Sequence, residues 1–462
     1  MIVKLESPMT VNEIAKAVDG IYDGNPEEKI FRVITDSREA KTGDLFFALG
    51  GEHSDGETYV DEAIAGGAIA VSVHARAGVL LVRDTKKALL HLAEEYRRHL
   101  SSLLYVIGVT GSVGKTTTKE FLRAILSKKY RVHATEKNYN NELGVPLTLL
   151  AAPKKTEVLI VEMGMNHAGE ISLLSEAVRP DLSIITNIGT AHIGNLGSRE
   201  MIAAAKREIL VGMQGGVVLV PSDEELLAQI PNRMTVSLQD PTADFFLLPY
   251  RTDVTGSAAD FYHKERVISD LVLNAPGRHL LSALSFAISA AVLLGLSDRE
   301  IVSGVSSISD DKIRQSIYKI GNVAIFDDAY NASFESVMAA VETLDLFRGM
   351  KRCALIGDML ELGAKTEEYH RRVGATLFAH EFSFLYLHGV YAPFTALGAK
   401  DAGFAADRIF ENTNVLAPEI TAKAILARAE EKEILLVKGS RAVHLERILD
   451  AMKEITEGKT NA

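Results

Sequence analysis

The 462-residue chain has a single cysteine, Cys353, so its composition excludes an internal disulfide bond. One thiol cannot form an internal bridge, and so little cysteine is typical of a protein from a reducing compartment. Cys353 lies in the apolar run 353–356. This position predicts a buried core residue rather than a reactive thiol.

Long apolar segments are also missing. The first six residues lack the apolar stretch of a signal peptide. The longest apolar run, 287–296, includes a serine and is far shorter than the roughly 20 residues of a membrane-spanning helix. The sequence therefore predicts a cytoplasmic enzyme without membrane insertion.

An excess of basic residues is the third absence, since the net charge is -11. A general nucleic-acid-binding protein normally has a basic surface, so no nucleic-acid partner is expected. An anionic small ligand is still possible, because a few local lysine and arginine residues can hold phosphates on an acidic protein.

What the chain does have is length and apolar content, with 47% hydrophobic residues. At roughly 150 residues per domain, the length indicates about three domains. Strands and helices alternate along most of the chain, which predicts α/β domains with parallel sheets. The changes in pattern place the domains at 1–100, 101–308 and 309–462.

The expected elements support this division. In the first domain, strands are predicted at 30–35, 45–49 and 68–73, with helices at 60–65 and 86–100. The second domain is expected to have strands at 104–109, 158–161 and 182–186, strand-rich stretches at 216–220 and 244–273, and helices at 116–128 and 278–296. In the third domain, strands are predicted at 323–326, 354–356, 384–387 and 434–437.

The strongest local motif is the glycine loop at 110–116, which follows an apolar strand and precedes a helix. Its backbone N–H groups and the helix N-terminus suit phosphate, Lys115 would reach the β- and γ-phosphates, and Thr116 would bind Mg²⁺. The general motif has a glycine six positions before the lysine. Here Val109 occupies that position and Gly108 precedes it, so an ordinary strand-to-helix turn is the alternative.

Polar residues also follow other predicted strands of the second domain. Glu162 and His192 lie after two of them, where the ends of parallel strands face a ligand crevice and where a metal could bind. The segment 138–141 holds three asparagines, which can also be read as a surface loop. Lys206 lies on a predicted helix and, by spacing alone, is a solvated lysine.

In the third domain, polar groups follow predicted strands at 327–331, 357–363 and 438–441. Such groups are expected where one domain closes over a ligand held by another.

In their order along nearly the whole chain, these motifs resemble the Mur ligase family of peptidoglycan synthesis. The resemblance also includes Asp36-Ser37-Arg38, the segment 43–49 and Asp55-Gly56. The segments 162–171, 328–332 and 357–363 are similar to those of the dipeptide-adding members. The implied fold is α/β with three domains: a small α/β N-terminal domain, a central P-loop-type parallel-sheet ATPase domain, and a Rossmann-like α/β C-terminal domain.

The resemblance also implies roles for individual residues. The catalytic residues would be Lys115, Lys206, His192 and Asn138. ATP would be bound by Thr110, Gly111, Ser112, Val113, Gly114, Lys115, Thr116, Thr117, Arg314, Asp328 and Asn331. Two Mg²⁺ ions would be held by Thr116, Glu162, His192 and Lys206, the last as a carbamate. The substrate would contact Ser37, Arg38, Asn140 and Asn141.

The implied reaction is ATP-dependent activation of a carboxylate as an acyl phosphate, followed by attack of an amine. The substrates would be a UDP-N-acetylmuramoyl peptide and D-alanyl-D-alanine, and a monomer is expected. Leu280 and Ala283 occupy positions where the family has asparagines, and Phe334 one where it has proline. A related ligase with another acceptor, or a nucleotide-binding protein without ligase activity, are therefore the alternatives.

Overall fold

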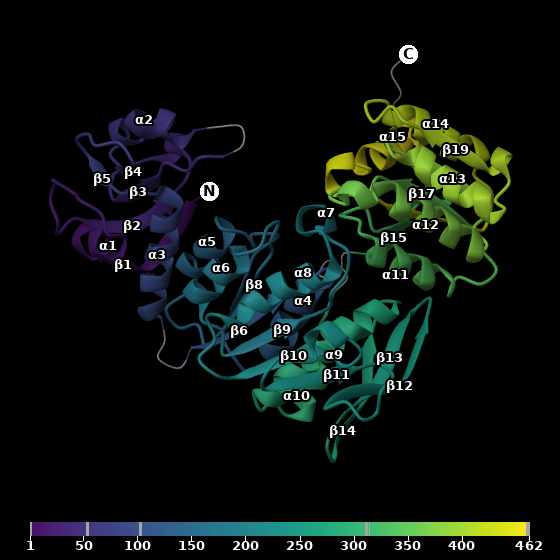
Figure 1. Cartoon of the computed structure of the whole chain (residues 1–462), viewed down its shortest axis with the longest axis horizontal. Helices are drawn as coiled ribbons and strands as arrows, with labels where there is room; N and C mark the ends of the chain where they lie inside the picture. Colours follow the sequence, from purple (N-terminus) through teal and green to yellow (C-terminus); the bar gives the residue numbers. More distant parts are fainter. Residues whose placement is uncertain (1, 52–54, 101–103, 310–312, 314, 459–462) are drawn as a thin grey trace. The chain divides into compact units, whose positions relative to one another are not determined.

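The computed structural model describes residues 2–51, 55–100, 104–309, 313 and 315–458. Their strands form sheets of five, nine and six strands, in that order along the chain (Figure 1). Two compact units can be distinguished by their internal contacts. One consists of 1–110, 126–184 and 205–218, and the other of 111–125, 185–204 and 219–462.

The N-terminal sheet has the order β1-β2-β3-β4-β5. Its strands are β1 (Ile2–Thr10), β2 (Lys29–Ile34), β3 (Asp44–Phe47), β4 (Ile69–Ser72) and β5 (Val79–Leu81), and its helices are α1 (Val11–Ala17), α2 (Val60–Ala65) and α3 (Thr85–Arg98). Strand β1 is antiparallel to β2, while the other pairs are parallel. Helix α1 begins with a capping box, in which Thr10 and Glu13 satisfy each other's backbone N–H groups.

The central sheet has the order β14-β13-β12-β11-β10-β9-β6-β8-β7. Its strands are β6 (Tyr105–Thr110), β7 (Val132–Ala134), β8 (Val158–Glu162), β9 (Leu182–Ile185), β10 (Val217–Pro221), β11 (Arg233–Ser237), β12 (Phe245–Asp253), β13 (Gly256–His263) and β14 (Arg266–Leu273). The associated helices are α4 (Lys115–Leu126), α5 (Gly144–Leu150), α6 (Glu170–Val178), α7 (Ile193–Leu196), α8 (Arg199–Arg207), α9 (Arg278–Leu293) and α10 (Asp298–Ser306).

The expectation of a parallel central sheet is correct for the strands around the glycine loop. Strands β6, β8 and β7 are parallel neighbours, so their carboxyl ends share one edge. The strand-rich stretch 244–273 instead forms the antiparallel strands β12, β13 and β14. Their short connections leave no room for the crossover helix that parallel pairing requires.

The C-terminal sheet has the order β15-β16-β20-β17-β18-β19. Its strands are β15 (Ser316–Ile320), β16 (Val323–Asp327), β17 (Lys351–Gly357), β18 (Phe384–His388), β19 (Ile409–Asn412) and β20 (Glu433–Lys438). Its helices are α11 (Phe334–Leu344), α12 (Thr366–Ala379), α13 (Ala392–Ala402), α14 (Pro418–Arg428) and α15 (Glu446–Thr456). All pairs except β15–β16 are parallel, as expected for a Rossmann-like sheet.

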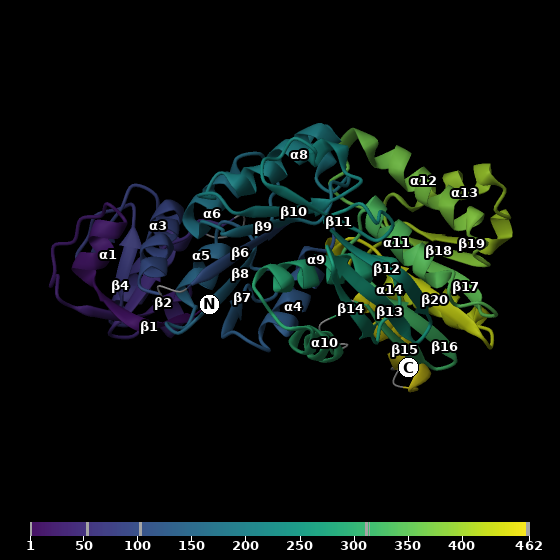
Figure 2. The same ribbon diagram turned by 90° about the horizontal axis from the view of Figure 1, so that it is seen from below.

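Helices α12 and α13 run beside the strands of this sheet (Figure 2). Helices α14 and α15 contribute residues such as Ile425 and Leu449 to a core shared with the strands. Cys353 belongs to the same core and is 3% exposed, which confirms its predicted burial. Burial raises the pKa of its thiol, so the reactive thiolate is disfavoured.

None of the helices in the described ranges has the length and apolar character needed to cross a membrane.

Tyr96 of helix α3 supports an irregular part of strand β1. Its side chain is buried, and its hydroxyl oxygen accepts hydrogen bonds from the N–H groups of Glu6 (3.1 Å) and Ser7 (3.4 Å), within the bulge between Lys4 and Met9. We expect Tyr96→Phe to lower the free energy of unfolding by about 1–2 kcal/mol, because both N–H groups lose their acceptor. Urea denaturation measures this change. The exposed Tyr59→Phe is the control, and equal stability of the two variants would contradict the role of the hydroxyl.

Candidate functional site

The glycine loop connects β6 to α4, and its two glycines have different surroundings. Gly111 has φ +146°, and a Cβ there would lie 1.9 Å from the Thr186 hydroxyl oxygen. Gly114 has φ +84°, and a Cβ there would meet no atom within 4 Å. The first glycine therefore allows the loop to lie directly against the end of β9, while the second faces open space.

The side chains at the two ends of the loop make backbone contacts. Thr110 donates its hydroxyl hydrogen to the carbonyl oxygen of Met163 at 2.8 Å, which ties the end of β6 to the residue after β8. Lys115 Nζ donates to the carbonyl oxygens of Gly111 (2.7 Å) and Ser112 (3.3 Å). The lysine thus lies along the loop, where its charge is close to any phosphate bound there.

The middle of the loop is held by residues after β9, which were not among the predicted site residues. The side-chain oxygen of Asn187 accepts from the N–H groups of Ser112 (3.0 Å) and Val113 (2.9 Å). The hydroxyl oxygen of Ser112 accepts from the N–H of Gly189 at 2.9 Å. The available signal was the position of Asn187, since polar residues directly after a parallel strand are frequently at a site.

Glu162 is the last residue of β8 and lies opposite Val109 in the pairing with β6. Its side chain is 1% exposed, and its Oε1 accepts from Asn140 Nδ2 at 2.7 Å. Its N–H donates to the Thr135 hydroxyl oxygen at 3.0 Å. The predicted carboxylate is thus held in a fixed orientation at the edge of the sheet where the glycine loop begins.

The three predicted asparagines have different environments. Asn140 orients Glu162, whereas Asn141 accepts from the N–H groups of Leu143 (3.3 Å) and Gly144 (2.9 Å) at the start of α5. Asn138 is exposed, and its carbonyl oxygen accepts from the N–H of Asn140 at 2.8 Å. The segment is therefore a hydrogen-bonded turn that presents Asn140 to the carboxylate.

Spacing along the helix predicted that Lys206 is solvated, and this prediction is wrong. Lys206 lies near the end of α8, and its side chain is only 1% exposed. Burial of an ammonium group is unfavourable unless partners compensate it. A solvated lysine is therefore the wrong reading of this position.

His192 precedes α7 with φ +64°, a backbone conformation that is uncommon for residues other than glycine. Its Nδ1 lies 2.5 Å from Glu361 Oε2, and this contact lowers the pKa of the Glu361 carboxyl. Glu361 has a similar φ of +65°. Two strained backbone positions are thus occupied by side chains that meet each other, as is common at functional sites.

In the C-terminal sheet, the carboxylate of Asp328 pairs with Lys438 Nζ at 2.6 Å, and the Lys438 side chain is 2% exposed. Lys438 also donates to the carbonyl oxygen of Asn331 at 3.0 Å. The Asn331 side-chain oxygen accepts from the N–H groups of Ala332 (2.9 Å) and Arg441 (3.4 Å). Both predicted residues thus connect the loops after β16 and β20, while the predicted Arg314 lies outside the described residues.

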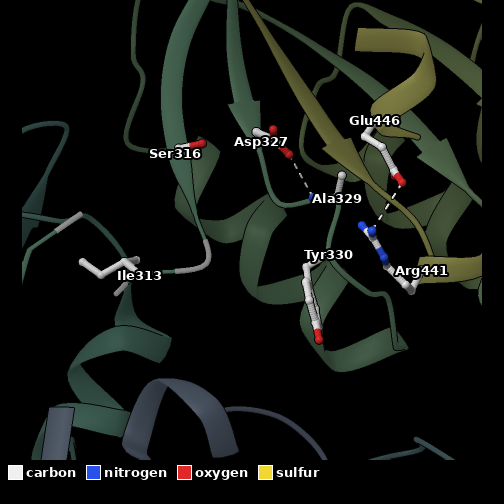
Figure 3. Close-up of a pocket in the computed structure, with 7 residues that line it drawn as sticks. All are labelled: Ile313, Ser316, Asp327, Ala329, Tyr330, Arg441 and Glu446. Atoms are coloured by element: carbon white, nitrogen blue, oxygen red, sulfur yellow. Dashed lines mark hydrogen bonds and ion pairs between the residues drawn. The ribbon is translucent and has the colours of Figure 1, made fainter. Parts of the chain in front are cut away.

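A cavity of about 230 Å³ lies beside these loops (Figure 3). It is lined by Ile313, Ser316, Asp327, Ala329, Tyr330, Arg441 and Glu446. Arg441 lies over the Tyr330 ring at 6.0 Å and pairs with Glu446 at 3.5 Å. The cavity offers an aromatic face, a cation and carboxylates, which suit a polar ligand with a flat or charged part.

The predicted substrate residues of the N-terminal sheet lie at the 3₁₀ turn Ser37–Glu39. The Ser37 hydroxyl donates to Glu62 Oε2, and Ser37 is 7% exposed. The Arg38 side chain is 79% exposed and pairs with Asp36 at 2.7 Å, which lowers the pKa of Asp36 to about 2. Arg38 is therefore accessible to an anionic ligand, while Ser37 is engaged within the protein.

The residues that depart from the family pattern have packing roles. Leu280 and Ala283 in α9 are 2% and 4% exposed, so these positions belong to the apolar core. Phe334 begins α11, and its ring packs against Tyr369 at 5.3 Å and under the Arg372 guanidinium at 4.2 Å.

The oxygen donors suit Mg²⁺, which binds proteins through few carboxylates and keeps substrate phosphates and water as further ligands. Glu162 supplies a buried carboxylate and Thr116 a hydroxyl in the first turn of α4. Among the described residues, no group of three or more His, Cys, Asp and Glu side chains is arranged so that it could hold a metal ion by itself. Mg²⁺ does not require such a group, because one or two protein carboxylates together with substrate phosphates and water can complete its coordination.

Two family models match the chain: the Mur ligase middle domain over residues 109–291, and the Mur ligase, glutamate ligase domain over residues 314–441. A relative from Bacillus subtilis, a UDP-N-acetylmuramoyl-tripeptide–D-alanyl-D-alanine ligase, is 36% identical over 459 residues, which cover 96% of this chain and 98% of the relative. The chain belongs to the Mur ligase family. A Synechocystis protein with the same name is 35% identical over 90% of both chains.

Solved structures agree with this Mur ligase assignment. The chain is similar to MurF from Acinetobacter baumannii, with a TM-score of 0.89 and 31% identity over 98% of this chain and 100% of that one. It is also similar to MurF ligase from Thermotoga maritima in complex with ADP, with a TM-score of 0.81 and 28% identity over 93% and 98% of the two chains. The expected three-domain α/β fold is thereby confirmed.

Gly111 provides a sharp test of the glycine loop. We expect Gly111→Ala to weaken ATP binding at least about tenfold, because its Cβ collides with Thr186 and the backbone conformation is strained. Equilibrium binding of ATP measures the effect. Gly50→Ala, whose Cβ would meet no atom within 4 Å, is the control. Parental affinity in the Gly111 variant would show that the loop does not bind the nucleotide.

Proposed function

We propose that this Mur ligase joins D-alanyl-D-alanine to a UDP-N-acetylmuramoyl tripeptide and converts ATP to ADP and phosphate. The observation that carries the proposal is the similarity over nearly the full length of both chains to ligases of this name. The product is a precursor of peptidoglycan, which connects the enzyme to cell-wall synthesis, cell shape and division.

The reaction consists of two displacements. A carboxylate oxygen of the tripeptide attacks the γ-phosphorus of ATP, and the bond to ADP breaks, which gives an acyl phosphate. The amine of the dipeptide then attacks the acyl carbon, and inorganic phosphate leaves while the nitrogen loses a proton. Phosphorylation is needed because a free carboxylate is a poor acyl donor at neutral pH.

The glycine loop is the proposed site of the ATP phosphates. Lys115 lies along the loop and would neutralise charge where the carboxylate and the γ-phosphate, both anions, approach each other. The cofactor-binding set comprises residues 110–117 together with Arg314, Asp328 and Asn331. The cavity beside the last two residues, with the Tyr330 ring and Asp327, supports a nucleotide contact from the C-terminal domain.

Two Mg²⁺ ions complete the proposal, held by Thr116, Glu162, His192 and carbamoylated Lys206. When bound, Mg²⁺ withdraws charge from phosphate and carboxylate oxygens. The fixed orientation of Glu162 supports its role as a ligand. A carbamate forms when a neutral amine adds to CO₂ and releases a proton, and the burial of Lys206 keeps its amine away from bulk water.

The remaining assignments are also proposals. Arg38 is the accessible cation for the UDP-linked substrate, with Ser37, Asn140 and Asn141 as further contacts and Asn138 as a catalytic residue. Domain boundaries near 101 and 309 separate the three sheets. We infer a monomeric enzyme that works in the cytoplasm, the compartment in which UDP-linked precursors and ATP are both available.

Acceptor dependence tests the proposed function. We expect phosphate release from ATP only when a UDP-N-acetylmuramoyl tripeptide and D-alanyl-D-alanine are present together, because the acyl phosphate needs both a carboxylate and an amine. A phosphate assay with each substrate omitted in turn measures this requirement. A panel of single amino acids in place of the dipeptide is the control. Turnover that ignores the dipeptide, or that prefers another acceptor, would contradict the proposal.

Lys206 tests the carbamate. We expect Lys206→Ala to abolish turnover and a small carboxylic acid to restore part of it, because the acid supplies the missing anion. Steady-state phosphate release with and without added acid measures the rescue. The exposed Lys155→Ala should retain parental activity in both conditions. An active Lys206→Ala enzyme would refute the role.

A further inference from the structure

Residues 186–189 hold the middle of the glycine loop through both side chains and backbone. The N–H of Ser112 is shared between the side-chain oxygen of Asn187 (3.0 Å) and its backbone oxygen (3.2 Å). Both backbone polar groups of Val113 are hydrogen-bonded. Its N–H donates to the Asn187 side chain, and its carbonyl oxygen accepts from the Thr186 hydroxyl at 2.6 Å. This segment of the loop is therefore anchored from a neighbouring strand end.

These contacts divide the glycine loop into two parts. The N–H groups of Ser112 and Val113 already have an acceptor within the protein, so they do not need phosphate to satisfy them. The open side of the loop begins at Gly114, where a Cβ would meet no neighbouring atom within 4 Å. The first part of the loop is thus anchored within the protein, while Gly114 faces open space.

The chemistry of the amide explains why asparagine suits this place. A carboxylate would also accept the two N–H groups, but it would add a negative charge beside the phosphates of ATP. An aliphatic side chain would leave the Val113 N–H without its acceptor and the Ser112 N–H with the backbone oxygen of residue 187 alone, at a cost to the shape of the loop. The amide oxygen of Asn187 satisfies the donors without adding charge.

We propose that Asn187 is a positioning residue for nucleotide binding, which holds Ser112 and Val113 so that the loop has its binding shape before ATP arrives. A loop ordered in advance loses less conformational entropy on binding, so affinity depends on the support. The inference rests on the proposed role of the glycine loop as the phosphate site. It adds a residue that touches the loop rather than the nucleotide.

The test compares Asn187→Ala and Asn187→Asp with the parent and with the exposed control Asn274→Ala. We expect Asn187→Ala to weaken ADP and ATP binding about tenfold and to raise KM for ATP similarly, while kcat at saturating ATP changes less than threefold. Asn187→Asp keeps the acceptor and should retain the parental melting temperature. It should lose more affinity for ATP than for ADP, because ATP carries more negative charge.

Hydrogen exchange of the Ser112 and Val113 amides gives a readout that does not depend on nucleotide. We expect both amides to be protected in the nucleotide-free parent and in Asn187→Asp. In Asn187→Ala, the Val113 amide should exchange faster, with a smaller change at Ser112, whose N–H keeps the backbone oxygen of residue 187. Unprotected amides in the parent, or unchanged nucleotide affinity in Asn187→Ala, would overturn the proposal. Tighter binding in that variant would overturn it too, since the amide would then compete with phosphate. A parent that binds no nucleotide would refute the phosphate site, while exchange would still decide whether Asn187 holds the loop.

Discussion

The close approach of the glycine loop to the end of β9 is the constraint on which the rest of the nucleotide site depends. It requires that residue 111 has no side chain, since the Thr186 hydroxyl occupies the space that a Cβ would fill. The same approach brings the Asn187 side chain within hydrogen-bonding distance of two loop amides. The missing side chain at residue 111 thus allows the end of β9 to hold the Ser112 and Val113 amides.

Much of the fold could be predicted because local patterns agree with the final structure. Helix α2 begins and ends at the predicted residues, and strands such as β16 and β18 differ from prediction by a residue at an end. Strand β1 was missed because alternation with polar residues and a bulge hide its apolar positions. The antiparallel strands β12 to β14 were recognised only as strand-rich, since pairing direction depends on contacts between segments rather than on composition.

In the candidate site too, residues marked by their sequence neighbours could be predicted, whereas those whose environment is set by distant segments could not. The glycine loop and Glu162 are visible in the sequence because each follows an apolar strand. Lys206 was misjudged on spacing, because burial of a helical lysine depends on what covers the helix, and that is set by residues far away in the chain. The family resemblance selected Lys206, while the partners that orient other groups, such as Asn187 for the loop and Glu361 for His192, became visible only with coordinates.

The buried thiol of Cys353 has a practical consequence for observing this enzyme at work. Since the only cysteine is shielded within a sheet core and its thiolate is disfavoured, thiol-reactive dyes will have little access to the native chain. Cysteines introduced at exposed positions of the N-terminal and C-terminal sheets can therefore be labelled without first removing the natural one. A donor and an acceptor fluorophore placed in this way would report distances between domains as nucleotide and substrates are added.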